Sequence, residues 1–224
     1  KTSWFIISTI VILITIVYFF FKYREKILIK EKEKLETIVS ERTAEVVASK
    51  KEIETQKDQL EIQKHEITDS INYSKRIQNA ILPEQSLLFE KFEQSFILYE
   101  PKDIVSGDFY FLANGENDDF YVAVADCTGH GVPGAFMSMI GSKELTEVIK
   151  TKQQPADILS GLNIGIRKTL KQGNLEIGIK DGMDIAFLSI NTSIKNEKLN
   201  IIYSGANRPL WLLKKNTTEL LSIK

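Results

Sequence analysis

The pattern of apolar and polar positions divides the chain into three parts. The first part contains a run without charged side chains, WFIISTIVILITIVYFFF at residues 4–21. As a helix, this run is about 27 Å long, close to the thickness of the hydrocarbon layer of a bilayer. It is longer than the apolar part of a signal peptide, and no small-residue cleavage pattern follows it. We therefore expect a transmembrane helix within residues 1–21.

The second part, residues 22–82, is rich in charge and contains no Gly or Pro, which favours one long helix that ends before Pro83. Apolar side chains recur in it at the seven-residue spacing of a coiled-coil seam, at Val39, Val46, Ile53, Leu60 and Ile67. The positions four residues further on are mostly polar. The pattern predicts a weak coiled coil that joins two copies of the chain, and a passive solvated spacer is the alternative.

The third part, residues 83–224, has the pattern of a globular domain. Helical spacing predicts one helix from Val132 or Pro133 to Lys150 and another over Pro155–Leu170. Stretches of β-branched and aromatic residues predict strands over Phe96–Tyr99, Val105–Leu112, Phe120–Ala125, Met183–Ile190, Leu199–Ser204, Leu210–Leu213 and Leu220–Ile223. Helices that are segregated from antiparallel strands place the domain in the α+β class.

The charge and cysteine content of the chain bear on its binding partners and on its cellular compartment. The chain has 29 basic and 30 acidic residues, so we expect no nucleic-acid partner. Its single cysteine, Cys127, fits a reducing compartment. Basic residues from Lys22 to Lys30 follow the apolar run, which predicts that everything downstream lies in the cytoplasm. Because residue 1 is Lys and not Met, we also expect the sequence to begin inside a longer protein.

Two aspartates flank a predicted hairpin at equal distances. Asp108 and Asp126 are each nine residues from Asn117, at the centre of the turn over residues 113–119. Antiparallel pairing would place their Cβ atoms about 5 Å apart on one face. Carboxylates this close repel each other unless a cation lies between them or one is protonated, and oxygen ligands favour Mg²⁺ or Mn²⁺. The alternative is that both are ordinary loop acids.

A glycine-rich turn directly follows the second of these aspartates. The stretch Cys127–Gly131 can bend tightly, and the predicted helix after it aims its N-terminal amides toward the same corner. A cation held by Asp108 and Asp126 beside a helix N-terminus would form a phosphate-handling site.

Four motifs in this order carry a family resemblance: VSGDFY, ADCTGHGVPGAFMS, DGMDIAF and YSGANRPLWL. Together they resemble the SpoIIE-type branch of the PPM metal-dependent serine/threonine phosphatases, over roughly residues 70–224. The resemblance implies an α-β-β-α sandwich in which a two-metal centre, Mn²⁺ or Mg²⁺, activates a water for attack on phosphoserine or phosphothreonine. It also suggests a bacterial signalling protein whose substrate is a small phosphoprotein, such as an anti-sigma-factor antagonist.

The motifs also imply roles for single residues. Asp126 matches the carboxylate that bridges both metals, Asp108 matches a ligand of one metal, and Cys127 matches a ligand that acts through its backbone carbonyl. For His130 we expect a role in shaping the turn. For Asp181 and Asp184 we expect a strand-capping role.

The sequence departs from the family pattern toward its end. Asp184 is the last Asp of the chain, so the two C-terminal metal-binding aspartates of the family have no counterpart here. We therefore expect residues 83–224 to be the N-terminal part of a phosphatase domain, with weak cation binding and little activity on its own. The alternative function is a non-catalytic, dimeric signal relay that binds a partner.

Overall fold

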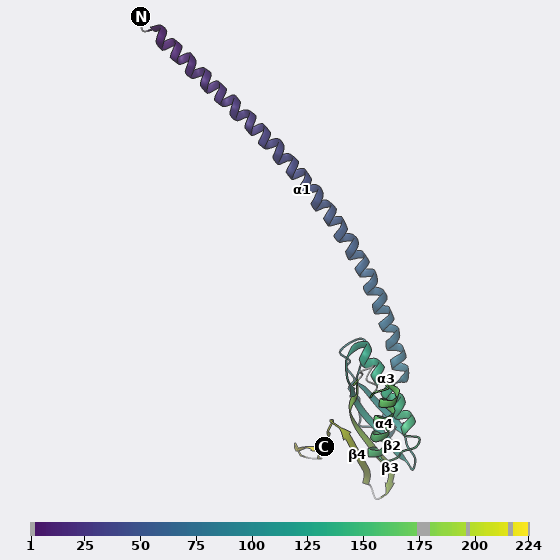
Figure 1. Cartoon of the computed structure of the whole chain (residues 1–224). Helices are drawn as coiled ribbons and strands as arrows, with labels where there is room; N and C mark the ends of the chain where they lie inside the picture. The colour runs from purple at the N-terminus through teal and green to yellow at the C-terminus, as the bar shows by residue number, and fades with distance from the viewer. Residues whose placement is uncertain (1–2, 174–179, 196–197, 215–216, 224) are drawn as a thin grey trace. The chain divides into compact units, whose positions relative to one another are not determined.

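The computed structural model describes residues 3–173, 180–195, 198–214 and 217–223. The chain divides into two compact units, residues 1–65 and 66–224. Figure 1 shows the order of the elements along the chain. The predicted α+β class is confirmed, because one long helix precedes a domain of short helices and antiparallel strands.

Helix α1 spans Ser3–Ile81 and joins the apolar run to the charged stretch that follows it. Its N-terminal part is long and apolar enough to cross a membrane, and its side chains there are exposed. The predicted seam residues are exposed as well, for example Ile53 at 64% and Leu60 at 66%. Within the described part of the chain, nothing covers this row of apolar side chains.

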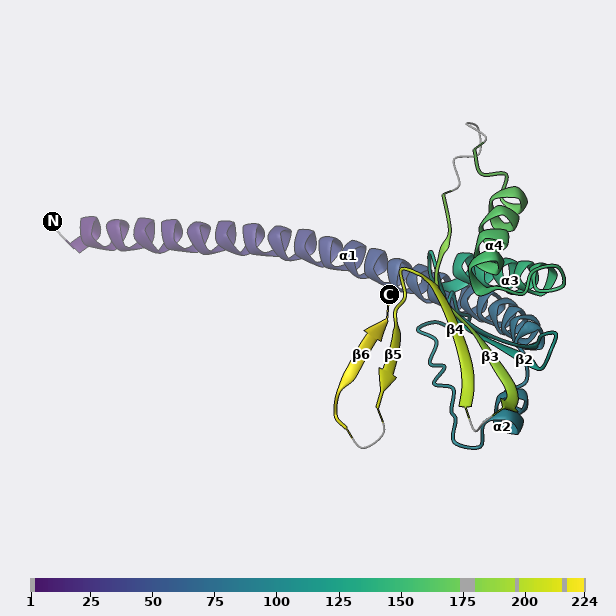
Figure 2. The same ribbon diagram turned by 90° about the horizontal axis from the view of Figure 1, so that it is seen from below.

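The second unit is built on a four-stranded antiparallel sheet. Its strands β1 (Phe109–Asn114), β2 (Asp119–Cys127), β3 (Met183–Lys195) and β4 (Lys198–Ala206) lie in sequence order. A second, separate hairpin consists of β5 (Leu210–Leu213) and β6 (Leu220–Ile223) (Figure 2). The predicted bounds of β5 and β6 are confirmed.

Side chains alternate between the two faces of the sheet, as strand geometry requires. Helices α3 (Gly131–Val148) and α4 (Pro155–Thr169) cover one face. The main core lies there, with Phe109, Tyr121 and Phe187 from the strands and Leu145 and Ile158 from the helices. Helix α2 (Ser86–Lys91) and residues 92–99 pack against the other face around Phe120, forming a smaller core.

Two predicted strands are wrong in part or in whole. Phe96–Tyr99 forms no strand. Its Ile97 and Tyr99 pack on the smaller core while Phe96 and Leu98 are exposed, so the alternation reflects packing and not pairing. The strand predicted to begin at Val105 begins only at Phe109. The backbone of Ser106, which precedes it, instead bonds to the side chain of Gln78.

The core predicts a clear contrast between two isoleucines of α4. Ile158 is fully buried, whereas Ile164, on the same helix, is 67% exposed. Ile158→Ala should lower the free energy of unfolding by about 2–5 kcal/mol, because it removes buried methylenes and leaves a cavity. Ile164→Ala should change it by less than about 0.5 kcal/mol.

The measurement is urea unfolding of the full chain in detergent micelles, followed by pulse labelling of the buried thiol of Cys127. This thiol is the only one in the sequence. Equal losses in the two variants would show that α4 does not pack as described.

Candidate metal and phosphate site

Asp108 and Asp126 lie at the same end of neighbouring strands. The β1–β2 ladder pairs Phe109 with Ala125 and Asn114 with Phe120, which is the register predicted from the position of Asn117. Asn117 and Asp118 take positive φ angles of 53° and 62° in the turn. Continued by one residue, the same register sets Asp108 opposite Asp126.

A third carboxylate belongs to this group, and the sequence analysis assigned it a different role. Asp184 of β3 pairs directly with Asp126 of β2. Beyond that pair, the Thr128 amide donates to the Gly182 carbonyl (2.9 Å), and the Gly182 amide donates to the Thr128 hydroxyl (3.0 Å). These bonds hold β2 and β3 in register at the end where the acids lie.

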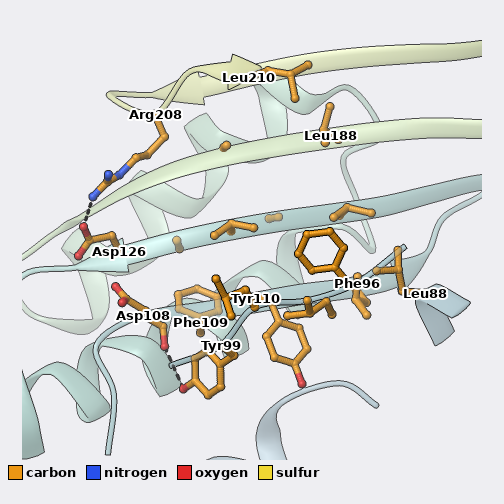
Figure 3. Close-up of a pocket in the computed structure, with 18 of the residues that line it drawn as sticks. Leu88, Phe96, Tyr99, Asp108, Phe109, Tyr110, Asp126, Leu188, Arg208 and Leu210 are labelled. Carbon is orange, nitrogen blue, oxygen red and sulfur yellow. Dashed lines mark hydrogen bonds and ion pairs between the residues drawn. The ribbon is translucent and has the colours of Figure 1, made fainter. Parts of the chain in front are cut away.

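The alternation of side chains places the acids on the face opposite α3 and α4. Ala125 and Cys127 point into the main core, so Asp126 between them points to the other side. Asp108 and Asp126 there border a pocket of about 560 Å³ whose floor is apolar, with Tyr110 and Leu188 among its lining (Figure 3). The carboxylates are thus open to solvent at one end of an apolar hollow.

Close packing of glycines fixes the chain around Asp108. A Cβ atom on Gly107 would lie 2.7 Å from the carbonyl oxygen of Gly129, and one on Gly134 would lie 2.6 Å from the same oxygen. Gly129 itself has a φ of 88°, which L side chains rarely adopt. The glycine-rich turn and the start of α3 therefore pack directly against the residue that precedes Asp108.

A buried amide supports the same segment from the end of α1. Gln78 Nε2 donates to the Ser106 carbonyl (2.7 Å) and to Ser138 Oγ (2.8 Å), while its Oε1 accepts from the Ser106 amide (3.1 Å). Ser106 Oγ in turn accepts from the Asp108 amide (3.0 Å). Side-chain hydrogen bonds therefore connect Gln78 to the backbone of Asp108 through one intervening residue.

Cys127 is buried, and its thiol is suited to packing and not to chemistry. Only 4% of the residue is exposed. Burial, together with the nearby Asp108 carboxylate, raises the pKa of the thiol to about 12, so it stays protonated at neutral pH. Within Cys127, the candidate metal ligand is therefore the main-chain carbonyl and not the thiol. That this carbonyl binds a metal ion remains a prediction.

His130 precedes α3, and its ring contacts a different acid. Its Nδ1 lies 2.9 Å from Asp103 Oδ2, and both side chains are exposed to solvent. Gly131 follows with a φ of 62°. The contact ties residue 103 to the turn, which agrees with the turn-shaping role expected for this histidine.

Arg208 was missed by the sequence analysis, although it lies within the fourth motif. Its guanidinium Nη2 donates to Asp126 Oδ2, and its Nε lies 3.9 Å from Asp184 Oδ2. The neighbouring Asn207 donates from its side chain to Asp184 Oδ1 (3.0 Å). Nothing in the spacing of the motif indicates these contacts. They depend on the tertiary structure, which places the turn after β4 next to the end of β2.

The donor chemistry fits a hard divalent cation. Asp108 and Asp126 offer carboxylate oxygens on one face, with the Asp126 side chain 50% exposed, and oxygen ligands suit Mg²⁺ and Mn²⁺. Across the described residues, however, no group of three or more His, Cys, Asp and Glu side chains is arranged to hold a metal ion. The carboxyl of Asp126 is instead directed to Arg208.

Comparison with known proteins identifies relatives of this domain. Residues 116–224 match the family described as Stage II sporulation protein E (SpoIIE). A solved structure, the SiaA-PP2C domain of Pseudomonas aeruginosa, superposes with a TM-score of 0.60 at 29% sequence identity. The match covers 72% of this chain and 61% of that one, so the chain spans less than two thirds of this relative. None of the curated proteins compared with the chain matches it.

The Gln78 network predicts a measurable contribution to stability. Gln78→Ala should lower the free energy of unfolding by about 1–3 kcal/mol, because it leaves the Ser106 backbone groups and Ser138 Oγ short of a buried partner. The control is Asn79→Ala on the same turn, since Asn79 is exposed. Both changes introduce Ala into the helix, so the difference between their urea midpoints reports mainly the network, with a few tenths of a kcal/mol from the different helix propensities of Gln and Asn. Matching midpoints would contradict the prediction.

Proposed function

We propose that the chain is part of a metal-dependent protein serine/threonine phosphatase, because residues 116–224 match the family described as Stage II sporulation protein E (SpoIIE). The observation that supports the proposal most is the placement of Asp108 and Asp126. They lie at one end of paired strands, on one face, beside the glycine-rich turn and the N-terminus of α3. A hydrolase of phosphate esters needs hard ligands and an anion-binding surface together.

In this proposal the chain's own residues would hold two cations, Mn²⁺ or Mg²⁺, and orient the substrate. Asp126 would be shared by both cations, Asp108 would be a ligand of one, and Cys127 would contribute its backbone carbonyl. When bound, the cations supply a water activated for attack on the phosphorus of phosphoserine or phosphothreonine. The apolar pocket beside the acids provides a surface for the protein part of a phosphoprotein.

The N-terminal part of α1 supports a membrane tether. We propose that the run from Trp4 to Phe21 crosses the cytoplasmic membrane once, with the phosphatase domain in the cytoplasm. The basic residues that follow, Lys22, Arg24, Lys26 and Lys30, favour this orientation. The physiological role would be the output step of bacterial signalling, with a phosphoprotein such as an anti-sigma-factor antagonist as the substrate.

The exposed seam of α1 supports a homodimer. Apolar side chains at seven-residue spacing, each about 60% exposed, bury their surface most simply against the same helix of a second copy. The second core position of each heptad is mostly polar, which keeps such a dimer weak. A weak dimer suits a signalling helix, because its two copies can shift relative to each other.

Phosphatase activity tests the proposed function. In the full-length protein with Mn²⁺, Asp126→Asn should lower hydrolysis of a phosphoserine peptide at least about 100-fold, because it removes the negative charge of the carboxylate proposed to be shared by the two cations. Asp157→Asn, an exposed acid on α4, should leave the rate unchanged. Activity that survives Asp126→Asn, or that persists in excess EDTA, would exclude the proposed mechanism.

Disulfide cross-linking tests the dimer. Ile53→Cys lies on the seam, whereas Thr55→Cys lies on the opposite side of α1. Mild oxidation in membranes should link copies of Ile53→Cys and leave Thr55→Cys monomeric, and the buried Cys127 should not interfere. Equal cross-linking at both positions would indicate random collisions, and no cross-linking at either would favour a monomeric spacer.

A further inference from the structure

The charge on the proposed metal site is already partly neutralised by the protein. Arg208 contacts two acids of the site. It donates to Asp126 (Figure 3) and approaches Asp184 to 3.9 Å. All three side chains are between 41% and 50% exposed. The guanidinium therefore lies at the solvent-facing edge of the site, where a cation from solution would also arrive.

The main chain that carries Arg208 is held in place independently of the guanidinium. The Tyr203 hydroxyl donates to the Arg208 carbonyl, and Asn207 forms an isolated bridge to Ile185 with a φ of 60°. The Asn207 side chain also bonds to Asp184. Because these contacts fix the turn, the arginine side chain can leave the carboxylates by rotation of its own bonds, without a change in the fold.

Two carboxylates on directly paired residues need a positive charge nearby. Asp126 and Asp184 are such a pair, and at a Cβ separation of about 5 Å their charges repel. A guanidinium and a divalent cation both meet this need, and Arg208 already occupies Asp126 Oδ2. A cation that binds through this oxygen would have to displace the guanidinium.

We propose that Arg208 is a tethered counter-ion that competes with the divalent cation for Asp126 and thereby sets the affinity of the site. This rests on the metal-binding role proposed for Asp126. In the absence of a cation, Arg208 stabilises the acidic end of β2 and β3. Cation binding displaces its side chain, so part of the binding energy of the cation is used to break this ion pair.

Binding of Mn²⁺ to the full chain in detergent micelles tests the proposal, with loss of the electron paramagnetic resonance signal of free Mn²⁺ as the readout. Arg208→Gln should bind Mn²⁺ about two- to fivefold more tightly than the wild type, the range expected for loss of a half-exposed ion pair. Arg208→Lys retains the charge and should remain close to the wild type. Arg167→Gln, which removes an exposed arginine from α4, should have no effect.

A second readout is the labelling rate of the Cys127 thiol, which reports opening of the domain. In EDTA, Arg208→Gln should label faster than the wild type because the acids lose their counter-ion, and Mn²⁺ should slow its labelling more than it slows the wild type. A uniformly unfolded variant would label fast with or without Mn²⁺, which would also contradict the proposal.

The outcomes separate the counter-ion from the metal site. If Asp126→Asn weakens Mn²⁺ binding but Arg208→Gln binds like the wild type, the counter-ion role is wrong and the metal site stands. Equally tight binding by Arg208→Gln and Arg208→Lys would mean that the charge is not the cause, and would also overturn it. If Asp126→Asn leaves Mn²⁺ binding unchanged, the metal role of Asp126 fails and this inference fails with it.

Discussion

The register of three neighbouring strands is the constraint on which the site depends. Pairing of β1 with β2 brings residue 108 opposite Asp126, and pairing of β2 with β3 sets Asp184 on the other side. A slip by one residue in either ladder would turn an acid toward the main core, where an unpaired charge is very costly. The buried residues of the core face, such as Phe109, Ala125 and Ile185, therefore also determine where the charges lie.

Packing at the end of the sheet holds in place the backbone that carries the acids. Gly107 and Gly134 approach the Gly129 carbonyl too closely for any side chain, and Gln78 satisfies the backbone that the strand leaves unpaired before Phe109. These contacts come from three separate segments of the chain: the end of α1, residues 106–107 and residues 129–134. The position of the acids at this end thus depends on uncharged residues, namely Gln78 and the glycines.

Local patterns in the sequence were sufficient for the hairpin but not for the wider site. Turn residues around Asn117 and continuous β-formers on both sides determine the β1–β2 register within one short segment, so counting from the turn was enough. Asp184 and Arg208 lie more than fifty residues beyond Asp126, and their approach depends on pairing of distant strands. No periodicity encodes that pairing. The strand predicted at Phe96–Tyr99 failed for a related reason, since alternation indicates a buried face but does not identify a hydrogen-bonded neighbour.

With the roles proposed for Asp126 and Arg208, a counter-ion within the chain would let the domain fold before it binds a metal ion. Carboxylates gathered on one face repel, and a site that relied on a cation alone would be stable only when loaded. Arg208 supplies a positive charge from a turn that is anchored by Tyr203 and Asn207. Because the ion pair is half-exposed, it is weak enough for a divalent ion to displace. In that scheme the sheet would form first, and the same acids would remain available for a cation afterwards.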